Sequence, residues 1–427
     1  MLSSMNAAVS GMNANGTMLS VISDNIANQN TVGFKSSSVN FEDVLSGMTG
    51  SVQVGRGVLV SSTAPSFAQG SFESTTNALD MAIDGNGFFI VQPGSGTAYT
   101  RAGQFSTDKG GNIVNPDGAI LQGYQADSSG NITGAMGNLK IATSQVPANI
   151  TTKANVAVNL QSTAAAEANP FTLDSNGDGI ANDPGNYNFS TTISIFDSQG
   201  ASHPVTAYFA KTADNAWTVH YVYEDPANPG SLLEAGTQNL TFNTNGSLNN
   251  DNSGTAIPFN FGPSVAAQSV TFDYGTGTGE TPAGDGFDGT TQFASDFATM
   301  DLNQNGYASG TLKDVTVGNS GIISGVFTNG QTRSIGQVAL AKFIAPTELS
   351  KMGKNLYGET YGSGQPIVGA PNTSGLGSVL SNTLEQSNVD LADEFVKMIA
   401  AQRGFEADSK IITTTDQLMQ QLVNLKQ

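Results

Sequence analysis

The chain has 427 residues, of which 50 are glycine, none is cysteine and 12% are charged, and its formal net charge is −19. The absence of cysteine excludes disulfides and thiol chemistry. The acidic balance argues against nucleic acid or an anionic membrane as a partner, because phosphate binding needs clustered Lys and Arg. The many glycines favour turn-rich β structure, and the length predicts two or three domains.

Two features bear on membranes and export. No apolar run approaches the ~20 residues that span a bilayer, so we expect no membrane insertion. The first residues lack a basic region followed by an apolar core and a cleavage site. If the protein leaves the cell, we expect it to do so without a cleaved signal peptide.

Residues 1–30 predict one amphipathic helix. Apolar side chains recur at steps of three and four, which is the spacing of a heptad seam, with Gly16 as a gap. The seam residues are Leu2, Met5, Val9, Met12, Leu19, Ile22 and Ile26. The helix is expected to end near Asn28, Asn30 and Gly33, because Asn and Gly tolerate a left-handed backbone.

The end of this helix carries a motif, Ala27-Asn28-x-x-Thr31-x-Gly33-Phe34-Lys35. The motif resembles the signature near the N-terminus of bacterial flagellar rod and hook proteins. After it, residues 31–75 are expected to form an extended connector that bends at the Gly-Arg-Gly of residues 55–57.

Residues 76–146 and 307–383 are expected to form one core β domain. The two apolar runs around Asp84-Gly85-Asn86-Gly87 are predicted to pair as a hairpin, because such dipeptides favour tight hairpin turns. The sequence around this turn resembles the core domain of flagellar axial proteins, and so do residues 321–330 and 335–343.

Residues 147–306 are expected to form an outer β domain inserted into the core domain. Alternating apolar residues between positions 191 and 223 predict three half-buried antiparallel strands. The apolar positions are Ile193, Ile195, Val205, Ala207, Phe209, Trp217, Val219, Tyr221 and Tyr223.

One loop of this insert has the spacing of a calcium site. Positions 1, 3, 5 and 9 of such a loop are occupied by the candidate ligands Asp174, Asn176, Asp178 and Asn182, with Gly179 at position 6. Position 12 is Gly185 rather than a bidentate Glu, and Asp and Asn also occur in turns as backbone caps. Two interpretations stay open, namely calcium that stiffens an exposed loop and a turn without metal. No other cofactor is expected.

Residues 384–427 predict a second, long helix, which Ser387 or Asn388 is expected to cap. Its apolar seam residues are Leu391, Phe395, Met398, Phe405, Ile412 and Met419. Gln402, Ser409 and Asp416 share the seam, where polar side chains tend to set register and partner number. The N-terminal helix is the partner that the chain offers. We expect further copies of both helices to complete the cover.

A second motif, Ser387-Asn388-Val389-Asp390, precedes this helix, and Gln402-Arg403-Gly404-Phe405 follows within it. Both resemble the closing signature of the flagellar rod and hook proteins. Because the two signatures occur at opposite ends in the expected order, the chain is identified as a member of the flagellar axial rod and hook family.

This resemblance implies a mainly β fold with α-helical termini, in which nested β domains stand on a coiled-coil-forming pair of terminal helices. It implies a structural subunit of the flagellar hook, which polymerises with itself into a curved, flexible tube and acts as a universal joint between rod and filament. The implied partners are the rod, hook cap and hook–filament junction proteins and the flagellar export apparatus. The implied location is extracellular, at the flagellar basal body and hook.

Two alternatives remain. A distal rod subunit shares both signatures, although the length of the insert 147–306 favours the hook. A calcium-dependent extracellular adhesin or carbohydrate-binding β protein would explain the acidic loops but not the paired signatures. No enzyme is expected, because His203 and His220 lack a second His or Cys at ligand spacing and no nucleophile elbow or zinc-binding helix motif occurs.

Overall fold

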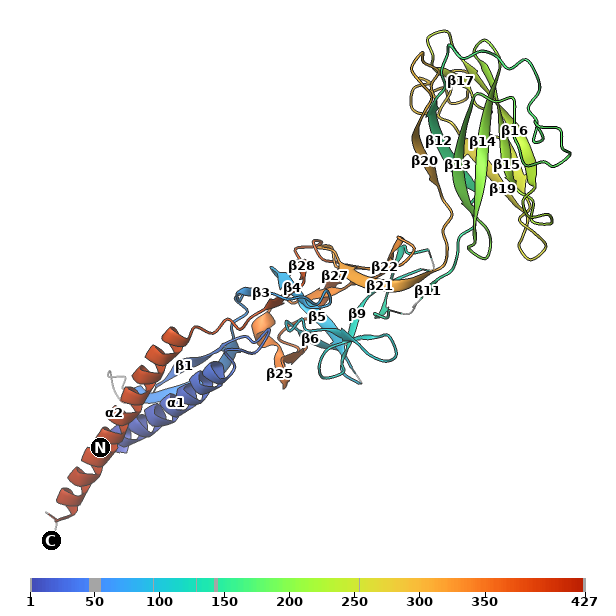
Figure 1. Ribbon diagram of the computed structural model, residues 1–427. Coiled ribbons are helices and arrows are strands. Elements are labelled where there is room, and N and C mark those ends of the chain that lie inside the picture. The colour runs from blue at the N-terminus through green and yellow to red at the C-terminus, as the bar shows by residue number, and fades with distance from the viewer. Residues whose placement is uncertain are drawn as a thin grey trace. The chain divides into compact units, whose positions relative to one another are not determined.

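The computed structural model describes residues 2–45, 55–94, 96–127, 129–141, 145–252 and 254–424. It confirms a mainly β fold with an α-helix at each end of the chain (Figure 1). The chain divides into two compact units. Unit 1 comprises Met1–Thr143, Lys313–Val326 and Thr332–Gln427, and unit 2 comprises Ser144–Leu312 and Phe327–Gln331.

The two terminal helices belong to unit 1. Helix α1 (Leu2–Ala27) has 26 residues, and helix α2 (Leu391–Asn424) has 34. Neither contains proline, which would remove a backbone donor and clash with the preceding turn. At the end of α1, the side-chain amide of Asn28 donates to the carbonyl oxygen of Asp24 at 2.9 Å, which satisfies one of the open helix carbonyls.

The segment 31–75, which the sequence predicts to be an extended connector, contains a two-stranded antiparallel ribbon. Strand β1 (Ser37–Leu45) pairs antiparallel with β2 (Gly55–Pro65), and both strands pack on α1. Gly57 makes this packing close, because its φ is +118° and an added Cβ would lie 2.0 Å from Oγ of Ser10. The same hydroxyl accepts a hydrogen bond from the amide of Val58 at 3.2 Å.

Two short strand pairs then connect the two ends of the chain. Strand β3 (Phe72–Ser74) pairs with β29 (Thr383–Glu385), and β4 (Met81–Asp84) pairs with β28 (Ser378–Ser381). The hairpin predicted around Gly85 and Gly87 is therefore wrong, since β4 and the following strand β5 (Phe88–Gln92) lie in different sheets. Both strands consist almost entirely of buried residues, so the apolar pattern identifies strands but not which strands pair.

The main sheet has fourteen strands. Nine of them follow in the order β11 (Gln145–Val146), β21 (Gly310–Val317), β22 (Ile322–Phe327), β23 (Thr332–Val338), β9 (Ile120–Ala126), β5, β6 (Ala98–Thr100), β26 (Leu356–Gly358) and β25 (Ser350–Gly353). The others are β10 (Ile132–Asn138) and β8 (Ile113–Val114) beside β9, β7 (Ser106–Thr107) beside β8, and β24 (Leu340–Lys342) between β5 and β27 (Ile367–Gly369). A short 3₁₀ helix, η1 (Pro346–Glu348), follows β24. Phe89 and Leu340 lie in the core cluster on one side of this sheet, and Phe88 and Phe343 lie in a second cluster.

Unit 2 is built from two sheets that share one core. The four-stranded sheet has the order β18 (Ala256–Phe259), β19 (Gln268–Asp273), β12 (Lys153–Asn159) and β20 (Ala298–Gln304). The five-stranded antiparallel sheet consists of β13 (Phe189–Phe196), β14 (Ser202–Ala213), β15 (Ala216–Glu224), β16 (Leu232–Phe242) and β17 (Leu248–Asn250). Strands β13, β14 and β15 confirm the three strands predicted between residues 191 and 223.

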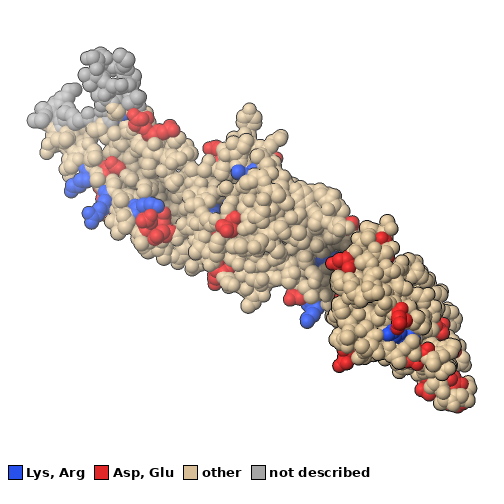
Figure 2. All heavy atoms as spheres, turned by 90° about the horizontal axis from the view of Figure 1, so that it is seen from above, with Lys and Arg blue, Asp and Glu red and all other residues tan. Residues whose placement is uncertain are grey.

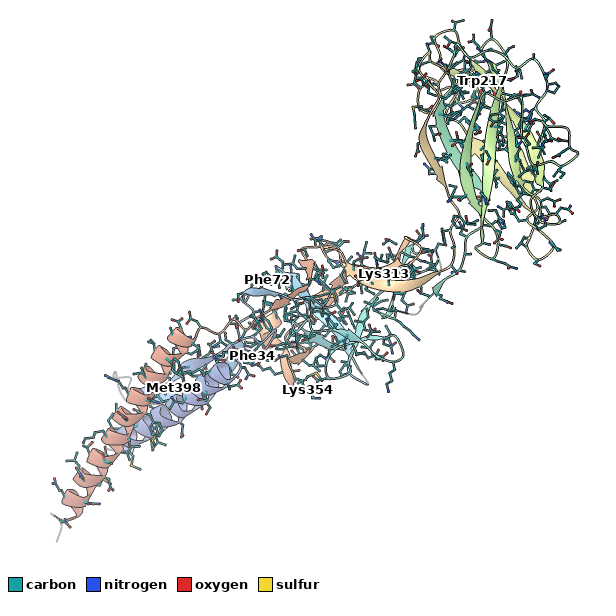
Figure 3. All side chains as sticks on the ribbon, in the orientation of Figure 1. Phe34, Phe72, Trp217, Lys313, Lys354 and Met398 are labelled. Carbon is teal, nitrogen blue, oxygen red and sulfur yellow. The ribbon has the colours of Figure 1, made fainter. Side chains whose placement is uncertain are left out.

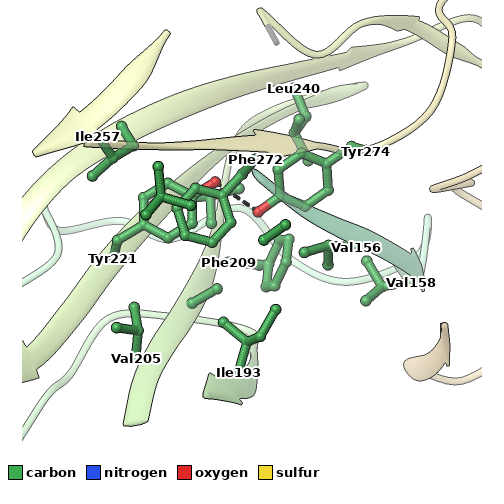
Figure 4. Packing of buried hydrophobic residues seen from close by; sticks show 14 of the residues in the cluster. Val156, Val158, Ile193, Val205, Phe209, Tyr221, Leu240, Ile257, Phe272 and Tyr274 are labelled. Carbon is green, nitrogen blue, oxygen red and sulfur yellow. Dashed lines mark hydrogen bonds between the residues drawn. The ribbon is translucent and has the colours of Figure 1, made fainter. Parts of the chain in front are cut away.

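Side chains from both sheets of unit 2 interdigitate in Figure 4. Phe272 of β19 stacks on Tyr221 of β15 with ring centroids 4.0 Å apart. The hydroxyls of Tyr221 and Tyr274 lie 2.8 Å apart, and Tyr221 also donates to Oε1 of Gln238 at 2.8 Å. Because these buried hydroxyls are hydrogen-bonded, the core carries no penalty for them. Unit 2 therefore has a hydrophobic core of its own.

Candidate functional site

Helices α1 and α2 pack against each other through small and polar side chains. An added Cβ would lie 2.6 Å from Oδ2 of Asp408 at Gly11, and 2.9 Å from Nδ2 of Asn15 at Gly404. Asn15 donates to Asp408 across the interface at 3.1 Å. The glycines therefore bring the helices close together, and the polar pair favours one register over others. Figure 3 shows Met398 on α2 where that helix runs beside α1.

The seam predicted on α2 is displaced by one residue from the face that α1 covers. Among the α2 side chains that the structure describes, the buried ones are Glu394, Ala401 and Thr415, and each lies one position before a predicted seam residue. Phe395 and Phe405 are accordingly exposed, by 49% and 38%. Met398 and Ile412 are half-buried, while Leu391 and Met419 are exposed.

Exposed apolar side chains of α2 extend beyond the predicted residues and lie on more than one side of the helix. We call this set of residues the α2 stripe, and it consists of Leu391, Phe395, Val396, Ile399, Phe405, Ile411, Leu418 and Met419. Its members include Val396 at 67% and Ile399 at 52% exposure. Exposed apolar surface of this extent is typical of an interface with another protein.

The predicted seam of α1 is covered unevenly. Ile22 is buried, Met12, Leu19 and Ile26 are half-buried, and Met5 and Val9 are exposed. The side chain of Leu2 lies outside the described residues. Since the ribbon β1–β2 and α2 both pack on α1, this helix is better covered within its own chain than α2 is.

The two sequence motifs meet where the terminal helices join the core of unit 1. Oδ1 of Asn388 accepts a hydrogen bond from the amide of Ser36 at 2.8 Å, and its Nδ2 donates to the carbonyls of Ser66 and Ala68 at 2.9 and 3.1 Å. Asn388 therefore ties the segment before α2 to both sides of the ribbon. Phe34 is buried, and the Lys351 ammonium lies 5.7 Å from the centre of its ring.

The remaining motif residues have local roles. The hydroxyl of Thr31 donates to Oδ1 of Asn28 at 3.2 Å. Asn28 is the first residue after α1, which ends at Ala27. The amide of Val389 donates to the Ser387 hydroxyl at 3.4 Å. The helix cap is Asp390 rather than Ser387 or Asn388, because its Oδ1 accepts the amides of Ala392 and Asp393 at 2.8 and 3.3 Å. The predicted cap is wrong because α2 begins only at Leu391 and Asn388 is bonded to the ribbon.

Three buried charges lie at this junction, and we call them the joint cluster. Lys35 and Glu385 are 0% exposed and Arg101 is 4% exposed. Nζ of Lys35 lies 2.7 Å from Oε1 of Glu385, and Nη1 of Arg101 lies 3.5 Å from Oε2 of the same carboxylate. Burial lowers the pKa of the Lys35 ammonium and of the Arg101 guanidinium, and Glu385 opposes both shifts.

Backbone groups complete the joint cluster. Lys35 also donates to the Ala68 carbonyl at 2.7 Å, and the amide of Gly70 donates to Oε1 of Glu385 at 2.9 Å. The amide of Gly33 donates to the Glu385 carbonyl at 2.8 Å. Gly33 has a φ of +69°, and an added Cβ would lie 2.5 Å from a core backbone nitrogen, so only glycine fits there without strain.

Sequence reasoning placed Lys35 in a motif but missed Glu385 and Arg101. In the sequence, each of these two residues is simply a charged residue beside a short apolar run, and this pattern does not show which residue it pairs with. The partners of Glu385 lie 350 and 284 positions away, so the cluster exists only in the folded chain.

The candidate calcium loop of unit 2 is closed by its own backbone. Oδ1 and Oδ2 of Asp174 accept the amides of Gly177 and Gly179 at 2.7 and 2.9 Å. Asn176 donates to Oδ2 of Asp178 at 3.1 Å. Asn182 is exposed, and its amide donates to a carbonyl within the loop. Among the described residues, no three His, Cys, Asp or Glu side chains are grouped so that they could hold a metal, and calcium binding stays a prediction.

Each histidine pairs with one carboxylate. His203 lies 2.8 Å from Asp197, and His220 lies 2.7 Å from Glu234.

On the face drawn in Figure 2, Asp and Glu are scattered singly over a surface that is mostly neither acidic nor basic. Within the described part of the chain, neither helix combines the length and apolar character that a membrane span needs.

Four family models match the chain, and together they cover both ends and both units. They are "Flagella basal body rod protein" over residues 5–35, "Flagellar hook protein FlgE/F/G D1 domain" over 82–178, "Flagellar basal body protein FlaE D2 domain" over 159–307 and "Flagellar basal body rod FlgEFG protein C-terminal" over 380–425.

Several known relatives match along the whole chain. The flagellar hook protein FlgE of Salmonella typhimurium (strain LT2) is 34% identical over 429 residues, which cover 99% of this chain and 100% of that protein. FlgE of Escherichia coli (strain K12) is 35% identical over 428 residues, covering 98% and 99%, and FlgE of Borreliella burgdorferi is 34% identical over 458 residues, covering 100% of both.

The fold is also similar to a solved structure. The crystal structure of the Helicobacter pylori flagellar hook protein FlgE2 matches with a TM-score of 0.52 at 16% identity and covers 72% of this chain and 98% of that chain. At this identity the match supports the fold alone. The full-length relatives and the four matched models show that the chain belongs to the flagellar hook protein FlgE family.

Proposed function

We propose that this chain is a structural subunit of the bacterial flagellar hook, which polymerises with copies of itself into a curved, flexible tube. The observation that carries the proposal is the α2 stripe, which α1 leaves exposed. Every copy carries the same stripe, so neighbouring copies can cover it. Contacts between different surfaces of identical subunits generate helical filaments when they do not close into a ring.

The tube works as a universal joint between rod and filament. Terminal helices of many copies line its inside, where the α2 stripe is removed from water. Unit 2 has its own hydrophobic core, so it can slide against the outer domains of neighbouring copies without losing its fold. The joint cluster and Asn388 transmit force between the terminal helices and the core of unit 1.

The further partners follow from membership of the family. The tube meets the rod at one end, grows beneath a hook cap and is joined to the filament by junction proteins. The subunit passes through the flagellar export apparatus without a cleaved signal peptide and is located outside the cell. The match to the D2 domain of FlaE over residues 159–307 supports a hook subunit over a distal rod subunit.

Electron microscopy of the purified, concentrated protein tests the proposal. A curved tube that bends is the expected result. A straight, stiff tube would instead assign the chain to the distal rod, and a protein that stays monomeric at all concentrations would contradict both assignments.

A further inference from the structure

The joint cluster contains two positive charges and one negative charge. Among the described residues, Glu385 is the one carboxylate that pairs with either Lys35 or Arg101. Removing one cation would leave a neutral ion pair in the cluster. Removing the carboxylate would leave two positive charges buried together, and an uncompensated buried charge is strongly destabilising.

The three charges come from three separate stretches of the chain. Lys35 follows the end of α1, Glu385 ends β29 a few residues before α2, and Arg101 follows β6 in the main sheet. Glu385 contacts both of the other stretches through its ion pairs with Lys35 and Arg101, and it also accepts hydrogen bonds from the amides of Gly33 and Gly70. The segment after α1 therefore has no counter-charge for Lys35 until the segment before α2 is in place.

We infer that Glu385 is the closing residue of this junction. The segment that follows α1 docks on the core only together with the segment that precedes α2, so the two terminal helices are seated as a pair or not at all. An incomplete chain that lacks residue 385 keeps its N-terminal helix free of the core. The inference concerns the folding of one chain and does not rest on the proposed function.

Hydrogen exchange of the full chain tests the inference directly. The amides to follow are those of Gly33, Ser36 and Gly70, because each donates to Glu385 or to the neighbouring Asn388. Glu385→Gln is expected to speed their exchange by about a hundredfold or more, which corresponds to losing one partner of a buried ion pair.

Single removal of a cation is expected to do less harm. Arg101→Met leaves the 2.7 Å pair between Lys35 and Glu385 intact and should speed exchange least. Lys35→Met leaves only the 3.5 Å pair and should fall between the two. A matched control is Glu394→Gln, since Glu394 is also a buried carboxylate of unit 1, but it pairs with the exposed Lys397 and accepts a bond from Asn25.

A double variant separates charge from packing. Lys35→Met is expected to restore part of the protection that Glu385→Gln removes, because it takes away one of the two uncompensated cations. If Glu385 acted through packing alone, the double variant would be worse than either single one. The amide exchange of β15 in unit 2 serves as an internal reference. If Glu385→Gln prevents unit 1 from folding, the amides of unit 1 exchange fast while those of β15 stay protected.

Three results would overturn the inference. The first is exchange in Glu385→Gln that stays within about tenfold of the unchanged chain, which is well below the effect of a buried unpaired charge. The second is an effect of Arg101→Met that equals that of Glu385→Gln. The third is a double variant that regains no protection. Polymer formation is not read out in any of these measurements, so failure of the proposed function would be seen separately.

Discussion

Replacing Phe395 by alanine is expected to weaken polymerisation while leaving the melting temperature of the monomer almost unchanged. Phe395 is 49% exposed within the α2 stripe. A phenylalanine offers about 150–250 Å² for burial, so on the order of 100 Å² is left for a neighbouring copy. At ~25 cal/mol per Å², and after the surface of the remaining alanine is subtracted, that area is worth about 2 kcal/mol on assembly, or about thirtyfold in critical concentration.

Sedimentation of polymer from monomer measures the critical concentration, and circular dichroism follows the melting of the monomer. The matched variant is Ile22→Ala, because Ile22 is 3% exposed in α1 and is buried within its own chain. Loss of this side chain is expected to cost about 2–4 kcal/mol of folding free energy in the monomer. The reasoning is refuted if Phe395→Ala lowers the monomer's melting temperature as much as Ile22→Ala does, or leaves the critical concentration unchanged.

Four further predictions concern Gly33, the insert 147–306, the pH dependence of the stability of unit 2 and the candidate calcium loop. Gly33→Ala is expected to lower the unfolding free energy of unit 1 in urea by on the order of 1–3 kcal/mol or more, because of its positive φ and the close core backbone. Gly16→Ala, with no atom within 4 Å of an added Cβ, should instead raise it by up to ~1 kcal/mol. Deleting residues 147–306 should leave polymers that differ in curvature or bending stiffness, and a folded, soluble deletion protein that forms no polymer would contradict this. Burial raises the pKa of Asp197, but a histidine ring and two amides bonded to its oxygens outweigh burial and hold that pKa below its ordinary value. The Asp197 carboxylate therefore contributes fully to the stability of unit 2 above the pKa of an unfolded aspartate, and this contribution is lost as the pH falls through the lower folded pKa. Asp197→Asn should reduce this loss of stability at acid pH. Urea unfolding at a series of acid pH values measures it. If the candidate calcium loop binds the ion, millimolar calcium is expected to raise the melting temperature of unit 2, and Asp178→Ala should remove that rise. Titration calorimetry that detects no heat of calcium binding would rule the site out.

The sequence by itself determined the class of the fold and the family. Helical ends are readable because a spacing of three and four marks one face of a helix, whatever that face later contacts. The strands of unit 2 are readable for a similar reason, since Val205, Ala207 and Val219 alternate with residues that are less buried. The terminal motifs are local too, and they needed no knowledge of the fold to be found.

Only the tertiary structure decided which elements meet. It paired β4 with β28 rather than with β5, and it buried Glu394, Ala401 and Thr415 of α2 rather than the seam positions that directly follow them. It also brought Glu385 to Lys35 across 350 positions of sequence. The physical reason is the same in each case. A periodic pattern records which side of an element avoids water, whereas the choice of partner depends on close approach, register and charge balance among residues far apart in the chain.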